Sequence, residues 1–335
     1  MEKARKLRKK IRKRIKRKGE ELEYSFIRIL TGSDLSGRRI PLMSVKSESP
    51  GPVVWITACV HGDEVGGVVV IQEIFRRIRK TPLLKGSLYA FPLMNPMGFE
   101  MASRQVTISE EDLNRSFPGN ENGSLAGRIA DKIFSTIKET KPDLVIDLHN
   151  DWRESVPYTL IEPSRDIDKY AYDKTKFFSK LTGFPVIVEV EDVEKTLTLT
   201  LLKSGIPALT LELGECYVVN ERDVEYGVKA VWDILVYLGM VEPVLGVPGF
   251  QLNERVKDKI LKYSQEPTSP TSGIIRFLVK PGEIVKKGQA VAKIYNAFGK
   301  LLETLKALDD AIVLGYSDSS VAFPGRPVMA FGVLE

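Results

Sequence analysis

Residues 53–64 read VVWITACVHGDE, a nearly unbroken apolar run that leads directly into a histidine and two acids. Apolar, β-branched runs of this length are typical of a strand covered on both faces. A second such run, 144–148, leads into His149. The chain has two histidines, His61 and His149, and each follows the carboxyl end of an expected strand. Ligand crevices form at this edge of open α/β sheets, so we expect both imidazoles to face one site.

Short β-branched runs alternate with longer amphipathic stretches from about residue 53 to 240. This alternation predicts an α/β fold, a mostly parallel or mixed sheet flanked by helices. Strands are expected over 53–60, 87–93, 144–148, 185–190 and 208–213, and helices over 64–80, 125–140, 166–181 and 224–238. After Gly239, prolines punctuate a polar stretch, and strand-like pieces at 273–279, 289–295 and 311–314 predict a smaller C-terminal all-β domain. We therefore expect three parts, 1–20, 21–240 and 241–335.

The net charge of +5 is unevenly distributed along the 335 residues. Residues 1–18 hold twelve Lys or Arg and one Glu, a net +11, whereas the remainder, with 37 basic and 43 acidic residues, has a net −6. In the basic run Ala4, Leu7, Ile11 and Ile15 recur at helical spacing, so both an amphipathic helix and a solvated, frayed arm stay open. The globular part is mildly acidic, which gives no reason to expect a specific nucleic-acid partner.

Cellular location is constrained by what the sequence contains. It has no apolar run long enough to span a membrane and no apolar core of a secretory signal, so no membrane span is expected. Its two cysteines, Cys59 and Cys216, cannot build a disulfide framework. We expect a cytoplasmic protein. Cys59 is interpreted as a buried strand thiol, with an extra metal ligand as the alternative.

A metal site is the chemistry that the histidines favour. Glu64 lies three residues after His61, and His149 arrives from another strand. Two imidazoles and one carboxylate form the pattern of catalytic zinc sites, in which a fourth position holds water. We therefore predict one Zn²⁺ per chain, bound by His61, Glu64 and His149, although cobalt or manganese suits the same ligands.

A hydrolytic metal site also needs a group that moves protons. Glu212 lies inside the expected strand 208–213, where an ionisable side chain is costly to bury without a compensating partner. Glu215, in the following loop, is the competitor. Asp63 and Asp147 are expected either to orient the ligands or to be ordinary loop or strand-end acids.

Residues 112–119, DLNRSFPG, place an amide beside a guanidinium. The planar fork of an arginine binds carboxylates with two parallel hydrogen bonds, and an asparagine adds a neutral donor. Asn114 and Arg115 are therefore candidates for binding a substrate carboxylate. Arg104 is a second candidate cation upstream.

Four motifs occur in this order along the chain: HGDE at 61–64, DLNRSFPG at 112–119, DLH at 147–149 and LELG at 211–214. Together they resemble the motifs of the succinylglutamate desuccinylase/aspartoacylase family, a branch of the zinc carboxypeptidase-like fold. The resemblance covers about residues 50–335. It implies zinc bound by His61, Glu64 and His149, with Glu212 as general base and then general acid. It also implies that Asn114 and Arg115 bind a substrate carboxylate and that Arg104 stabilises the oxyanion.

Two features qualify this resemblance. Aspartoacylase-like members place an arginine shortly before the catalytic glutamate, whereas residues 195–206 contain only the cations Lys195 and Lys203. Either Lys203 substitutes for that arginine or the substrate lacks the second carboxylate.

Residues 279–289 resemble the turn of a lipoyl or biotinyl barrel-sandwich domain but are not followed by a modifiable lysine hairpin, so we interpret the C-terminal domain as a cover or an assembly surface.

The predicted function is a zinc-dependent amide hydrolase, a deacylase for an N-acyl amino acid or similar small amide, that uses metal-activated water with Glu212 as base and acid. One alternative is a metallocarboxypeptidase, in which Arg115 binds a peptide C-terminus. Another is a non-catalytic binding protein that uses the basic arm. The expected partner is a small N-acylated substrate, and a homo-oligomer stays open.

Overall fold

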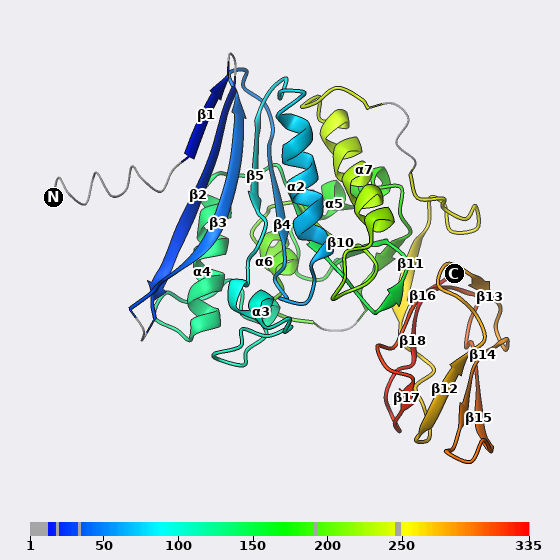
Figure 1. Ribbon diagram of the computed structural model, residues 1–335. Helices are drawn as coiled ribbons and strands as arrows, with labels where there is room; N and C mark the ends of the chain where they lie inside the picture. Colours follow the sequence, from blue (N-terminus) through cyan, green and yellow to red (C-terminus); the bar gives the residue numbers. More distant parts are fainter. Residues whose placement is uncertain (1–12, 18–19, 33–34, 191–192, 245–248, 335) are drawn as a thin grey trace.

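The computed structural model describes residues 13–17, 20–32, 35–190, 193–244 and 249–334. Its centre is one large mixed sheet in the strand order β1-β2-β3-β5-β4-β6-β10-β8-β9-β11-β18-β16-β13, with β7 paired to β16 (Figure 1). The parallel core consists of β5 (Ser87–Phe91), β4 (Val53–Ala58), β6 (Leu144–His149) and β10 (Ala208–Glu212). The predicted α/β class with a mixed sheet is confirmed.

Helices cover both faces of this sheet. One face carries α2 (Gly66–Ile78) and α7 (Glu221–Tyr237), with α5 (Lys169–Leu181) beside α7 (Figure 1). The other face carries α4 (Leu125–Glu139) and α6 (Leu197–Lys203). Side chains of a strand point alternately to the two faces. Ile56 therefore packs in the core beneath α2 and α7, while Trp55 packs in the core with α4 and α6. We call the second face the α4/α6 face. Short helical segments α3 (Pro96–Glu100) and η1 (Leu113–Arg115) lie in the loops that follow β5.

The N-terminal edge is antiparallel. Strands β1 (Lys13–Arg17), β2 (Glu20–Thr31) and β3 (Gly37–Ser47) form a meander that joins the core through β3 and β5. The helical alternative for the basic run is therefore wrong at Ile15, which pairs with Leu22 as part of β1. Residues 1–12, with Ala4, Leu7 and Ile11, lie outside the described residues.

The other edge continues into the C-terminal residues. Strand β8 (Tyr158–Ile161) runs antiparallel to β10, and β9 (Val186–Val188) pairs in parallel with both β8 and β11 (Ile260–Ser264). Antiparallel strands β18 (Met329–Val333), β16 (Ala311–Tyr316) and β13 (Ile284–Val285) follow, and β7 (Glu154–Ser155) pairs with β16. A separate four-stranded sheet contains β15 (Leu301–Lys306), β14 (Ala290–Tyr295), β12 (Gly273–Phe277) and β17 (Val321–Ala322).

The C-terminal strands thus serve two sheets, at the lower right of Figure 1. The predicted C-terminal antiparallel β structure is confirmed, but four of its strands extend the large sheet rather than forming an isolated barrel. No helix in the described part of the chain has both the length and the apolar character that crossing a bilayer requires.

Candidate metal centre and active site

The predicted metal ligands meet at the carboxyl edge of the parallel core. His61 lies in the loop after β4, Glu64 lies just before α2, and His149 is the last residue of β6. One ligand atom from each of the three lies within 4.8 Å of the other two. All three side chains are buried. This convergence of two imidazoles and one carboxylate fits a divalent cation.

The loop that carries His61 has a tight backbone. Cys59 adopts a positive φ of 55°, which is uncommon for a residue other than glycine. A Cβ atom on Gly62 would lie 1.9 Å from the carbonyl carbon of Gly98, so only glycine fits where the loop meets α3. The Gly62 amide also donates to the Ser103 carbonyl. The His61-Gly62-Asp63-Glu64 turn is therefore set by close contact with the loop after β5.

Both histidines share the same arrangement of ring nitrogens. The Nδ1 atoms of His61 and His149 lie 2.5 and 2.9 Å from the two carboxylate oxygens of Glu64. The Nε2 atom of His61 lies 3.2 Å from Asp112 Oδ1, and that of His149 lies 3.0 Å from Asp147 Oδ2. A carboxylate on the second nitrogen is the usual orienting partner of a metal-bound histidine. The three ligands and their outer partners thus fit a zinc-like ion.

The electrostatics of this group keep its carboxylates ionised despite their burial. Burial raises the pKa of Glu64, but the two neighbouring histidines outweigh burial and hold that pKa well below its usual range. Burial lowers the pKa of His149, whereas Glu64 and Asp147 raise it above its usual value. Burial raises the pKa of Asp112, and His61, Arg104 and Arg115 together lower it. The ionised carboxylates of Glu64 and Asp112 therefore attract positive charge to this site.

The end of β10 places Glu212 next to this group. Glu212 pairs directly with His149 in the β6–β10 register. Its Oε2 atom is buried without a hydrogen-bond partner among the described residues. Burial is the main cause that raises the pKa of Glu212 above its usual value; His149 lowers it, while Asp151 and Glu64 raise it. Glu215 lies beyond the strand in the loop, so Glu212 is the acid beside the histidines.

Arg104 reaches the edge of the metal group. Its guanidinium pairs with Asp112 Oδ2 at 3.1 Å, and its Nη1 atom lies 3.3 Å from His61 Nδ1 and 3.9 Å from Glu64 Oε1. About half of its side chain is exposed, so the guanidinium lies between the buried ligands and solvent. The structure therefore places a positive charge at the solvent-facing edge of the His61, Glu64 and His149 group.

Asn114 and Arg115 lie on η1, beside the same site. The Oδ1 atom of Asn114 accepts a hydrogen bond of 2.9 Å from the Leu197 amide at the start of α6, which leaves its Nδ2 group as the donor for a ligand. Arg115 is exposed, and its Nη1 atom donates to the Asn114 carbonyl.

Lys203, the alternative cation, is exposed in the last turn of α6, about 9 Å along the helix from Leu197. The structure therefore disfavours Lys203 as a substitute for the absent arginine.

Several site residues have no role in the sequence prediction. Asp112 belongs to the quoted motif, and its two oxygens contact His61 and Arg104. Tyr158 donates a hydrogen bond of 2.7 Å to Asp151 Oδ2 and pairs with Glu212 in the β8–β10 register. Burial raises the pKa of Asp151 to about 7; the bond from Tyr158 opposes this, and Glu64 adds to it. The sequence signal for Asp112 is its place at the start of the motif at 112–119, whereas nothing in the sequence indicates Tyr158.

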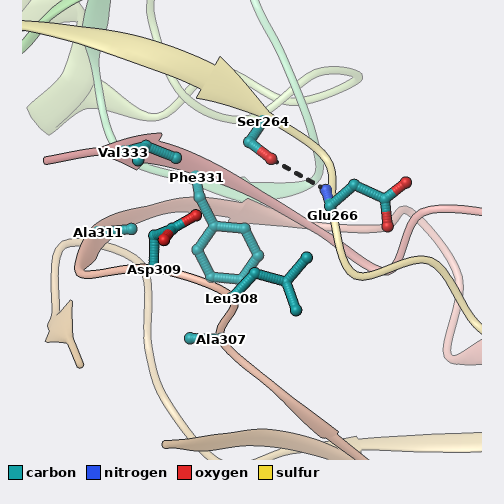
Figure 2. Close-up of a pocket in the computed structure, with 8 residues that line it drawn as sticks. All are labelled: Ser264, Glu266, Ala307, Leu308, Asp309, Ala311, Phe331 and Val333. Atoms are coloured by element: carbon teal, nitrogen blue, oxygen red, sulfur yellow. Dashed lines mark hydrogen bonds between the residues drawn. The ribbon is translucent and has the colours of Figure 1, made fainter. Parts of the chain in front are cut away.

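Two other groups do not join the metal set. Cys59 is fully buried but not among the three grouped ligands, and burial strongly raises the pKa of its thiol, which disfavours the thiolate that a metal binds. Figure 2 shows a pocket in the C-terminal strands that contains no imidazole. It is lined by Ser264, Glu266, Ala307, Leu308, Asp309, Ala311, Phe331 and Val333.

The large mixed sheet with a His2Glu group at its carboxyl edge defines the zinc carboxypeptidase-like fold. Residues 50–238 match the succinylglutamate desuccinylase/aspartoacylase catalytic domain. The chain belongs to this family, as the sequence motifs predict.

Relatives agree with this assignment. The N-alpha-acetyl-L-2,4-diaminobutyric acid deacetylase of Halomonas elongata is 26% identical over 283 residues, which cover 82% of this chain and 80% of the relative. The ectoine utilization protein EutE of Ruegeria pomeroyi has a TM-score of 0.77 at 23% identity, covering 96% of this chain and 98% of that one. A succinylglutamate desuccinylase/aspartoacylase of Rhodobacter sphaeroides has a TM-score of 0.78 at 23% identity, covering 95% and 96%. These two structures show a shared fold.

Proposed function

We propose that the protein is a zinc-dependent amide hydrolase that removes the acyl group from an N-acyl amino acid. The observation that carries this proposal is the convergence of His61, Glu64 and His149, with Glu212 paired beside His149. The family supports amide hydrolysis, and one relative is named a deacetylase of an N-acetylated amino acid. The buried free thiols of Cys59 and Cys216 support a reducing, cytoplasmic setting.

In the proposed mechanism, His61, Glu64 and His149 hold the ion, and Asp112 and Asp147 orient the two imidazoles. The bound zinc supplies a water of lowered pKa and polarises the substrate carbonyl. Glu212 takes a proton from the attacking water and returns it to the departing amine. Its raised pKa suits a group that must hold that proton between the two steps.

The other polar groups bind and orient the substrate. The Arg104 guanidinium donates to the oxygen on which negative charge develops. Arg115 and the Nδ2 group of Asn114 bind the α-carboxylate, which fixes the acyl amide against the metal group. The products are a carboxylate and a free amine.

The test is a Glu212→Gln variant, which keeps the size and hydrogen-bonding ability of the side chain but removes the base. We expect turnover of N-acetyl amino acids to fall by about 10²- to 10⁴-fold while bound zinc stays stoichiometric. Glu215→Gln is the matched control and should change turnover by less than about threefold. Loss of turnover in the control but not in Glu212→Gln would transfer the role to Glu215.

The same assay tests the rival activity of a metallocarboxypeptidase, which would use the same residues on a peptide C-terminus. We expect the zinc-loaded protein to hydrolyse an N-acetyl amino acid faster than a dipeptide with the same C-terminal residue. The opposite order would favour the carboxypeptidase.

A further inference from the structure

The separate four-stranded sheet of the C-terminal residues has one buried face and one exposed face. Ile275, Ala292, Ile294, Leu305 and Ala322, drawn from all four strands, lie together in a buried hydrophobic cluster. The residues next to these along each strand point to the opposite face, which we call the outer face. The sheet lies at the lower right of Figure 1, away from the helices that cover the large sheet.

A row of apolar side chains crosses the outer face from one edge strand to the other. On β12, Ile274 is directly opposite both Val321 of β17 and Tyr295 of β14. Tyr295 is in turn opposite Leu301 of β15. Ile274, Val321 and Leu301 are 51%, 52% and 45% exposed, and Tyr295 is half-buried. Because directly opposite residues lie side by side on one face, these four side chains form one apolar row.

Two phenylalanines extend this row at the end of the sheet that carries the β14–β15 turn. Phe298 lies in that turn and is 96% exposed. The turn is ordered by Asn296, whose Oδ1 atom accepts the amides of Phe298 and Lys300. Phe323, two residues after Val321, shares the outward direction of Val321 and is 56% exposed. The antiparallel pairing of β12 with β14 and β17 brings both rings to the same end of the sheet. A contiguous apolar patch of this kind marks an interaction surface.

Two cations lie behind the apolar row, further from the β14–β15 turn. Arg276 of β12 and Lys293 of β14 are directly opposite each other, two residues from Ile274 and Tyr295. The Arg276 guanidinium lies over the Tyr295 ring at 5.7 Å, and neither cation forms an ion pair within the part of the chain that the structure describes. Like charges that are directly opposite in a sheet destabilise it. An anionic partner would therefore compensate this pair.

The nearest acids of this region point away from the outer face. Glu303 is opposite Ile294, which belongs to the buried cluster, so its side chain shares the inner direction of Ile294. Asp318, in the turn before β17, accepts the Arg153 amide and faces the catalytic region. The outer face thus combines apolar side chains with unpaired positive charge. A second copy would bring a second pair of the same cations into the interface, so the charges favour an anionic occupant instead.

The order of the two rows matches the depth profile of a bilayer surface. Two residues of extended strand separate the apolar row from the cations by about 7 Å. Apolar groups of peripheral proteins reach roughly 5–10 Å into the boundary between headgroups and acyl chains, and basic residues at the surface are attracted by anionic lipids. With Phe298 and Phe323 in this boundary, Arg276 and Lys293 lie at the level of the lipid phosphates.

We propose that the outer face of the four-stranded sheet attaches the protein to a bilayer surface that contains anionic phospholipids. Phe298, Phe323 and the apolar row enter the boundary layer, and Arg276 and Lys293 pair with lipid phosphates. The attachment is peripheral and uses none of the metal-site residues. The inference therefore stands or falls independently of the proposed amide hydrolase function.

The experiment is sedimentation of the full-length, zinc-loaded protein with lipid vesicles. We expect binding to vesicles of equal parts phosphatidylcholine and phosphatidylglycerol to be at least about tenfold tighter than binding to phosphatidylcholine alone. Phe298→Ser removes the most exposed apolar side chain and should weaken binding to the mixed vesicles by about tenfold. Tyr170→Ser is the matched control, because Tyr170 is 63% exposed on α5, outside the sheet, and its loss should leave binding unchanged.

A paired substitution tests the charges. Arg276→Gln combined with Lys293→Gln should weaken binding to the mixed vesicles by about 10- to 30-fold at low salt, and the difference should shrink as salt is added. Lys286→Gln combined with Lys287→Gln removes the same charge from the turn between β13 and β14, at the opposite end of β14, and should have an effect of less than about threefold. Unchanged urea midpoints show that each variant keeps its fold.

Phe298→Trp reports insertion directly. The fluorescence that this substitution adds should shift to shorter wavelength on the mixed vesicles and be quenched by lipids with brominated acyl chains, as expected for a ring in the boundary layer. Vesicle binding without this quenching would overturn the inference.

Three further results would also overturn it. One is the absence of wild-type binding to the mixed vesicles. Another is equal binding by wild type, Phe298→Ser and the Arg276 and Lys293 double variant, which would assign vesicle binding to the basic residues 1–18. The last is a dimer in light scattering that Phe298→Ser abolishes, without vesicle binding, which would assign the outer face to a second copy.

Discussion

At the scale of single residues, the two histidines divide their ring nitrogens between Glu64 and an outer carboxylate. Asp147 lies on β6 two residues before His149, and its Oδ1 atom accepts a hydrogen bond of 2.6 Å from Thr57 on β4. Asp147 is thereby fixed by two neighbouring strands. A carboxylate held in this way fixes the orientation of the imidazole and increases its basicity.

We expect Asp147→Asn to weaken zinc binding by about 10- to 100-fold, because the neutral amide no longer increases the basicity of His149. The measurement is a zinc titration against a competing chelator at fixed pH. Asp131→Asn, on α4 and away from the site, controls for the loss of one negative charge and should leave zinc affinity unchanged. Equal affinities in wild type and Asp147→Asn would remove Asp147 from the metal centre.

The sequence predicts the meeting of His61, Glu64, His149 and Glu212, because parallel strands end at the same edge of a sheet. Tyr158 could not be predicted in the same way. Its position depends on the antiparallel register of β8 against β10, and a sequence of four largely apolar residues does not specify which neighbour that strand pairs with.

At the scale of elements, local pattern predicts the long helices and the buried strands well. No helix is expected from the sequence over 197–203, where threonine alternates with leucine, yet the structure forms α6 there. Thr196 Oγ1 accepts from the Leu199 amide, and Asn114 Oδ1 accepts from the Leu197 amide. These caps satisfy the first amides of the helix, so contacts from a distant loop outweigh the β propensity of the segment. Strand β1 is missed because the spacing of Leu7, Ile11 and Ile15 resembles that of a helix.

The start of α7 carries a buried acid that predicts a pH dependence of stability. Asp223 is 2% exposed, and neither of its carboxylate oxygens has a hydrogen-bond partner among the described residues. Burial raises its pKa from 3.8 to about 6; Arg222 lowers it and Glu215 raises it. Because the folded protein binds this proton more tightly than the unfolded chain, the group destabilises the fold as pH rises from 4 to above 6.

We expect Asp223→Asn to increase the free energy of unfolding at pH 8 by up to about 3 kcal/mol, with little change at pH 4. Urea unfolding of both proteins at the two pH values measures the difference. Glu225→Gln, on the same helix, controls for the loss of an acid and should show a much smaller pH dependence. A stabilisation by Asp223→Asn that is equal at both pH values would contradict the titration of Asp223 as its cause.

At the scale of the whole molecule, the C-terminal strands and the catalytic region share a core. One hydrophobic cluster combines Tyr158 and Ile187 with Ile312, Leu314 and Ala330 of β16 and β18. Strand β7 pairs with β16, and the Arg153 amide donates to Asp318 Oδ1. The division at residues 240 and 241 stays a prediction, but these contacts show that the C-terminal strands pack directly against the segment that follows His149.

We expect Leu314→Ala to lower the free energy of unfolding by about 2–5 kcal/mol, because Leu314 is fully buried in the shared core. Calorimetry should show one lowered transition rather than two, since the cavity weakens contacts on both sides. Leu308→Ala is the control, because Leu308 is 51% exposed and its loss should change stability by less than about 0.5 kcal/mol. A second, unshifted transition in Leu314→Ala would show that the two regions unfold separately.

The pairing of β7 with β16 also bears on how the protein is made. Ser155 pairs with Gly315, which lies 160 positions further along the chain. A nascent chain leaves the ribosome from its N-terminus, so His61, Glu64 and His149 are all outside long before the strand that packs beside Tyr158 has been translated. The segment that follows His149 therefore acquires its β16 neighbour only after about 160 further residues have been translated.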